Sequence, residues 1–134
     1  MTGPVPYLFF PGTAASALAF YQEVFGGELS LHTYEEFGRA DGPAEAIAHG
    51  ILSGPVDLYA ADAGADEDAV HVVGAPFALL GAASPAVSDE WFAGLAEGGT
   101  VLDPLQKRPW GAYDGQVIDR HGIRWLIGYQ EPAA

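Results

Sequence analysis

The pattern of hydrophobic and polar positions along this chain divides it into two similar blocks. The first block opens with the apolar run PYLFF (6–10), which has the length of a strand and is closed by Pro11-Gly12. Thr13 is a typical helix-capping residue. Apolar residues then recur with helical spacing at Ala17, Leu18, Tyr21, Val24 and Phe25. Gly26-Gly27 ends this helix, and three strands are predicted after it at 28–36, 46–53 and 56–62.

The second block has the same order of elements. A strand is predicted at 75–82, and a helix that turns Trp91, Phe92 and Leu95 inward ends at Gly98-Gly99. Three further strands are predicted, at 100–104, 111–119 and 123–129. Between the blocks lies the small, acidic segment 62–69, which is typical of a solvated linker.

The two blocks form an internal repeat. Residues 16–30 superpose on residues 88–102 with a constant offset of 72 positions, which aligns Phe20 with Phe92. We therefore expect an α+β fold of two βαβββ modules, at about 5–62 and 70–130. One such module leaves a sheet edge open, so two copies are expected to complete a curved eight-stranded sheet around a ligand-binding cleft.

Composition adds limits to this fold. The chain has 134 residues, 49% of them apolar, which suits a single folded domain spanning 1–134. It has no cysteine, so disulfides, thiolate nucleophiles and zinc–cysteine clusters are excluded. The N-terminus lacks the basic region of a signal peptide, and no apolar run is long enough to span a membrane, so we expect a cytoplasmic protein.

The net charge of −13 repels nucleic acids and anionic membrane surfaces. We therefore expect neither as a partner. The same charge favours a cationic ligand, although solubility explains an acidic surface equally well. A small molecule is the expected partner.

His49 stands alone in the run AEAIAHGILSG (44–54), where strand alternation places it on the same face as Ile47 and Ile51. The four histidines, His32, His49, His71 and His121, have no spacing that brings three ligands together. We therefore expect the His49 imidazole to find a hydrogen-bond partner, with no metal and no cofactor bound.

The candidate ligand-binding residues are aromatic side chains and one histidine on the predicted strands and loops. They are Tyr7, Phe9, His49, Tyr59, Trp110, Tyr113 and Trp125. Such groups line ordinary small-molecule pockets, and the alternative for each is a place in the core. Trp110 follows Pro109 in a loop beside Lys107 and Arg108, where a core tryptophan is less expected.

Three stretches carry a family resemblance: PYLFFPGTAASALAFYQEVFGGEL (6–29), AIAHGIL with VDLYAAD (46–62), and GGTVLDPLQKRPWGAYDGQVIDRHGIRWLIG (98–128). Their order and spacing resemble the vicinal oxygen chelate superfamily of glyoxalase I, bleomycin-resistance proteins and extradiol dioxygenases, and PhnB-like proteins within it. The resemblance implies paired βαβββ modules, a cleft, and frequently a homodimer.

Active members of that superfamily bind a divalent metal through His, Gln or Glu on set strands. The matching positions here hold Pro6, one of residues 58–60, one of residues 77–79, and Leu126. Among these only Tyr59 has a donor, and it suits a divalent cation poorly. Two hypotheses follow: a metal-free module that sequesters a cationic or aromatic small molecule, or a glyoxalase-like lyase, isomerase or dioxygenase with metal ligands at atypical positions.

Overall fold

The structure is a computed structural model that describes residues 4–71 and 74–131. The chain divides into two compact units, Met1–Val70 and His71–Ala134. Each unit contains one helix and one four-stranded mixed sheet, as the two predicted βαβββ modules require. In the described part of the chain, no helix is long and apolar enough to cross a membrane.

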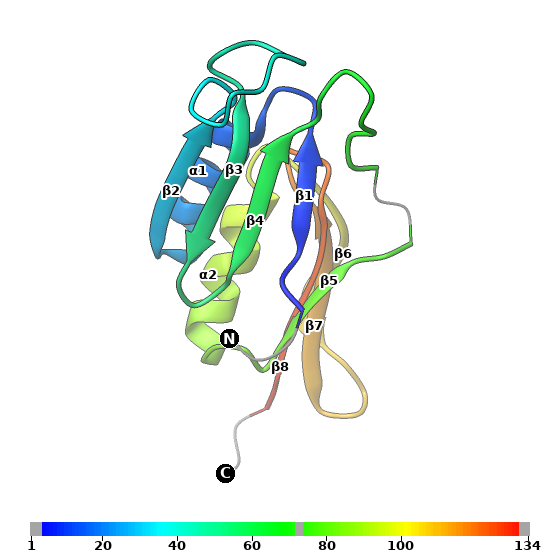
Figure 1. Cartoon of the computed structure of the whole chain (residues 1–134). Coiled ribbons are helices and arrows are strands. Elements are labelled where there is room, and N and C mark those ends of the chain that lie inside the picture. The colour runs from blue at the N-terminus through cyan, green and yellow to red at the C-terminus, as the bar shows by residue number, and fades with distance from the viewer. Residues whose placement is uncertain (1–3, 72–73, 132–134) are drawn as a thin grey trace. The chain divides into compact units, whose positions relative to one another are not determined.

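The first unit follows the predicted order of elements. They are β1 (Tyr7–Phe10), α1 (Ala14–Phe25), β2 (Glu28–Thr33), β3 (Ile47–Ser53) and β4 (Leu58–Asp62). The sheet order is β1-β4-β3-β2, with β1 parallel to β4 and the other neighbours antiparallel (Figure 1). Helix α1 packs on β2, β3 and β4, and its apolar stripe forms the core of this unit with Leu8 and Phe10.

Helix α1 packs closely against its sheet, and the residue of β3 beneath it is a glycine, Gly50. A Cβ added at Gly50 would lie 2.5 Å from Cδ1 of Leu18 and 3.2 Å from the carbonyl oxygen of Ala60. Gly50 and Ala60 therefore mark the helix-covered face of the sheet. Because neighbouring residues in a strand point to opposite faces, His49 and Tyr59 lie on the other side, called here the helix-free face.

The N-terminus of α1 is capped by a residue that the sequence analysis did not select. Thr13 was expected to cap it, but the Thr13 side chain makes no capping hydrogen bond. Instead, Oδ1 of Asp62 accepts from the Ala14 amide at 2.9 Å, and Oδ2 accepts from the Ile47 amide at 2.9 Å. Asp62 thereby joins the end of β4 to the starts of α1 and β3.

The second unit repeats this arrangement. Its elements are β5 (Phe77–Leu80), α2 (Pro85–Ala96), β6 (Thr100–Lys107), β7 (Ala112–Ile118) and β8 (Arg124–Gln130). The sheet order is β5-β8-β7-β6, with β5 parallel to β8. Helix α2 packs on β6, β7 and β8. The expected eight strands are therefore present as two four-stranded sheets, one in each unit.

Two strand ends differ from the prediction by three residues. The first strand after α1 was predicted to reach residue 36, but β2 ends at Thr33, where the chain enters the turn at 34–38. Strand β6 was predicted to end at Pro104 but continues to Lys107. It is an edge strand with two register shifts against β7, and proline is tolerated in such strands.

The acidic segment 62–69 is anchored to the first unit. The Ala63 amide donates to the Phe10 carbonyl at 2.8 Å, and the Val70 amide donates to the Phe9 carbonyl at 2.6 Å. Glu67 accepts from the Gly64 amide at 2.8 Å. The segment thus returns to β1 by hydrogen bonds at both ends, where the sequence suggested only a solvated linker.

Candidate ligand-binding site

Four of the predicted binding residues gather on the helix-free face of the first sheet. Tyr7 lies directly opposite Tyr59 in the β1–β4 register, and Ile51, two residues after His49, lies opposite Tyr59 in the β3–β4 register. The four side chains share this face because each of these residues is next in sequence to a residue on the helix-covered side, and side chains alternate between the two faces of a strand. We call this group the aromatic platform: Tyr7, Phe9, His49 and Tyr59.

The rings of the platform are in mutual contact. The Tyr7 ring centroid lies 5.2 Å from that of Phe9, 5.6 Å from that of His49 and 6.0 Å from that of Tyr59. The His49 and Tyr59 centroids are 5.8 Å apart. These separations are typical of interacting aromatic pairs. Tyr7 is 39% exposed and the other three are half-buried, so the group is not closed into the core.

Tyr7 and His49 are also joined by a hydrogen bond. The Tyr7 hydroxyl lies 2.9 Å from Nδ1 of His49 and 3.5 Å from the carbonyl oxygen of Ala48. Burial raises the pKa of Tyr7 above its usual value, and the negative charge of Glu67 raises it further, while Arg39 opposes them. The phenol therefore keeps its proton at neutral pH and can donate it to the imidazole.

A salt-bridge network fixes the charges near the platform. Nη2 of Arg39 lies 2.6 Å from Oδ2 of Asp41 and 3.2 Å from Oε1 of Glu67. The Arg39 guanidinium also lies 4.1 Å from the centroid of the buried Tyr34 ring. These contacts hold the loop after β2 against the segment after β4. The charge of Glu67 is therefore paired, although the side chain is exposed.

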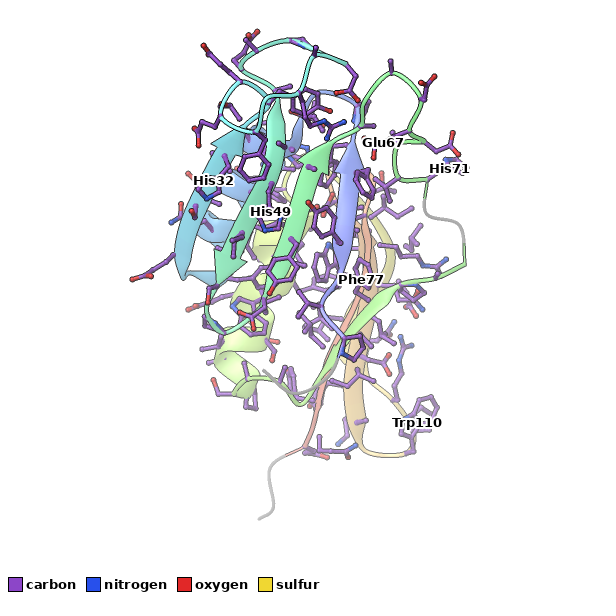
Figure 2. All side chains as sticks on the ribbon, in the orientation of Figure 1. His32, His49, Glu67, His71, Phe77 and Trp110 are labelled. Carbon is purple, nitrogen blue, oxygen red and sulfur yellow. The ribbon has the colours of Figure 1, made fainter. Side chains whose placement is uncertain are left out.

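His32 lies beside the platform, opposite His49 in the β2–β3 register. Its Nδ1 is 3.2 Å from Oε2 of Glu36, and its ring stacks on Phe37 with centroids 5.7 Å apart. Figure 2 shows His32 and His49 on neighbouring strands, while His71 follows the loop after Glu67. Within residues 4–71 and 74–131, no three His, Asp or Glu side chains are grouped so as to hold a metal ion.

Trp110 and Tyr113 belong to a separate cavity in the second unit. It measures about 250 Å³, and its lining is Leu80, Gly81, Trp110, Ala112, Tyr113, Asp114, Tyr129 and Gln130. Tyr113 stacks on Tyr129 at 5.1 Å, and Trp110 is 71% exposed. Asp114 is paired with Arg108 at 2.7 Å. The prediction that Trp110 lies outside a core is consistent with this position.

Trp125 lies in neither group. It is 1% exposed, and its Nε1 donates to Oδ2 of Asp119 at 2.8 Å. The side chain shares a face of β8 with the buried Ile127, and its ring meets Phe77 edge-on at 5.6 Å. Trp125 therefore has the core position that the sequence analysis held as its alternative.

A second cavity, of about 470 Å³, lies at the start of α1 and was not predicted. Its lining is Gly12, Ala15, Tyr34, Pro43, Glu45, Ala46, Ile47, Asp62 and Ala63. Both carboxylate oxygens of Asp62 already accept backbone amides, and the Tyr34 hydroxyl donates to the Asp62 carbonyl. The buried polar groups of this cavity are thus committed to holding the fold together. No sequence signal marks it, because its wall comes from four separated segments.

Comparison with known proteins settles the family. The sequence profile of the glyoxalase/bleomycin resistance protein/dioxygenase superfamily matches residues 4–127. The chain belongs to this superfamily. The resemblance seen in its sequence is confirmed, and so is the predicted fold.

Individual known proteins are similar over nearly the whole chain. Protein YjdN of Escherichia coli is 29% identical over 137 residues, covering 91% of each sequence. The crystal structure of PA1353 from Pseudomonas aeruginosa is 30% identical, with a TM-score of 0.80 over 98% of this chain and 100% of that one. A PhnB protein from Bacillus cereus is 20% identical, with a TM-score of 0.76 over 98% of this chain and 100% of its own, and shows the shared fold.

The residues at the superfamily's metal-ligand positions do not suit a metal in this chain. Pro6 precedes β1 and uses its carbonyl oxygen to accept from the Tyr59 amide at 2.9 Å. Phe77, Ala78 and Leu79 lie on β5 and Leu126 lies on β8, and none has a side-chain donor. Tyr59 has a phenol oxygen, but its ring is part of the aromatic platform. The donor set therefore gives no basis for a metal-dependent step at these positions.

Proposed function

We propose that this superfamily member is a binding protein for planar aromatic small molecules, and that the aromatic platform of the first unit is its binding site. The observation that carries the proposal is the contact of four partly exposed rings on the helix-free face of one sheet. A flat aromatic ligand would cover several of these rings at once. Ring stacking of this kind contributes about 0.5–1.5 kcal/mol per pair beyond the burial of area.

The platform combines this apolar area with few polar groups. The Tyr59 hydroxyl has no hydrogen-bond partner among the described residues, and the Tyr7–His49 pair provides the other polar atoms. A few well-placed polar groups within an apolar surface are the usual composition of a ligand site. The net charge of −13 favours cationic over anionic members of the ligand class.

A metal-dependent lyase, isomerase or dioxygenase remains the second hypothesis from the sequence. It requires at least three convergent ligands, and the described residues offer no such group. Metal analysis of the purified protein, together with a hemithioacetal assay, separates the two hypotheses. One tightly bound equivalent of metal with turnover would support the enzyme and contradict the binding protein.

The direct test is a thermal-shift screen of planar aromatic compounds, followed by calorimetric titration of those that raise the melting temperature. A ligand that binds the folded protein stabilises it by linkage. Tyr7→Ala and Tyr59→Ala should each weaken binding on the order of tenfold, which corresponds to about 1.4 kcal/mol.

Trp110→Ala is the matched control, because it removes an aromatic ring from the cavity of the second unit and leaves the platform intact. It should leave affinity within about twofold. If Trp110→Ala abolishes binding while the platform variants bind normally, the site lies in the second unit and the proposal is wrong. The homodimer implied by the resemblance stays a prediction, which sedimentation velocity would test.

A further inference from the structure

The Tyr7–His49 hydrogen bond links the proton that the platform can offer to the tautomer of His49. A phenol has one proton and can donate it once, and of the two available acceptors Nδ1 of His49 is nearer, at 2.9 Å against 3.5 Å for the Ala48 carbonyl. A neutral imidazole has one donor and one acceptor nitrogen. If Nδ1 accepts from Tyr7, the proton of His49 is on Nε2.

Among the described residues, that Nε2–H group has no acceptor. The one hydrogen bond of His49 with a described residue is made through Nδ1. The ring is half-buried on the helix-free face, in contact with the rings of both Tyr7 and Tyr59. A half-buried donor without a protein partner is satisfied by water or by a ligand, and satisfying it from a ligand gives selectivity.

We propose that the platform selects planar aromatic ligands that carry a neutral hydrogen-bond acceptor on the ring, such as a ring carbonyl, and that Nε2–H of His49 donates to it. This inference rests on the proposed function and names its ligand class. A neutral acceptor suits the site because no cationic side chain is a member of the platform. The nearby cation Arg39 is paired with both Asp41 and Glu67, so it offers no unpaired positive charge to a carboxylate ligand.

The opposite arrangement makes a different prediction. If Tyr7 donated to the Ala48 carbonyl, Nδ1–H of His49 would donate to the phenol oxygen. Nε2 would then be an acceptor, and the site would select ligands that carry a donor. The two arrangements place the proton on different nitrogens of one residue, so they can be told apart in the free protein.

The experiment compares two ligands of the same shape, fluorenone and fluorene, which differ in a carbonyl group and a methylene group. The wild-type chain should bind fluorenone about five- to tenfold more tightly, as one additional hydrogen bond allows. His49→Phe keeps a flat ring and removes the donor, so it should bind the two compounds equally. Tyr7→Phe removes the group that sets the tautomer and should reduce the preference.

Long-range ¹H–¹⁵N spectra of the histidine rings supply a readout that does not depend on affinity. The inference predicts the Nε2–H tautomer for His49 in the free protein, and the Nδ1–H tautomer would overturn it. Equal binding of fluorenone and fluorene by the wild type would also overturn it and would leave the aromatic-binding proposal standing. If neither compound binds, both the inference and the proposed function fail.

Discussion

The indole of Trp125 donates through Nε1 to Oδ2 of Asp119 at 2.8 Å within the core of the second unit. The other carboxylate oxygen, Oδ1, accepts from the amides of His121 at 2.7 Å and Ile123 at 3.2 Å. Asp119 therefore closes the turn between β7 and β8 and fixes the tryptophan that follows it. The Asp-x-x-Gly-x-x-Trp sequence at 119–125 is explained by this structural role.

Removing the carboxylate should be costly. Asp119→Ala leaves two amides and the Trp125 indole without their acceptor in a buried site, so we expect a loss of about 3–5 kcal/mol. Trp125→Phe removes one hydrogen bond and some volume, and should cost about 2–3 kcal/mol. Urea unfolding followed by circular dichroism measures both. A loss below about 1 kcal/mol for Asp119→Ala would contradict the assigned role.

The start of α1 provides a second test of stability. Asp62 is 5% exposed and accepts from the Ala14 and Ile47 amides, so Asp62→Ala should lower the free energy of unfolding by about 2–4 kcal/mol. Thr13→Ala is the matched control, because Thr13 occupies the cap position without a capping hydrogen bond. It should change stability by less than about 0.5 kcal/mol. Equal losses for the two variants would show that Thr13 caps the helix after all.

The Tyr129 phenol should lose its proton at a higher pH than an ordinary tyrosine. Burial and a 2.9 Å hydrogen bond to Asp89 raise the pKa of Tyr129 to about 12, against about 10 for an unperturbed tyrosine. Below pH 10 the phenol is protonated in both folded and unfolded states, and its contribution to stability is complete. As the pH rises from 10 to 12 the unfolded state loses this proton first, so stability falls across that window.

Tyrosinate absorbance near 295 nm, recorded for the wild type and corrected by Tyr129→Phe, isolates this titration. Asp89→Ala removes the hydrogen bond and the carboxylate charge and should move the midpoint of the corrected curve back toward 10. A midpoint near 10 in the wild type would exclude the raised pKa. Unchanged titration in Asp89→Ala would show that burial alone sets it.

The order of elements could be predicted from the sequence because the pattern of apolar residues repeats at an offset of 72 positions. Glycine pairs such as Gly98-Gly99 marked the helix ends. The end of β6 could not be predicted, since whether Pro104 ends a strand depends on its being at a sheet edge. The role of Asp62 depends on amides far away along the chain, up to 48 residues for Ala14, and no local pattern encodes that contact.

The candidate site could be predicted only in part, because it too depends on contacts that no local pattern encodes. Alternation placed His49 on a face with Ile51, but it states only which residues share a face. Which face a helix covers depends on tertiary packing. Trp125 looks the same as Tyr59 in a strand pattern, yet it is buried in the core of its unit, whereas Tyr59 lies on a helix-free face. The division of the predicted residues between two units likewise followed from strand pairing.

The central claim is that the aromatic platform of the first unit binds planar aromatic molecules. Its most direct test is a titration of the protein, labelled with ¹³C in its tyrosine rings, with a compound found in the thermal-shift screen. We predict saturable shifts in the ring signals of Tyr7 and Tyr59, with the signals of Tyr113 and Tyr129 unchanged. Saturable shifts confined to Tyr113 and Tyr129 would contradict the claim.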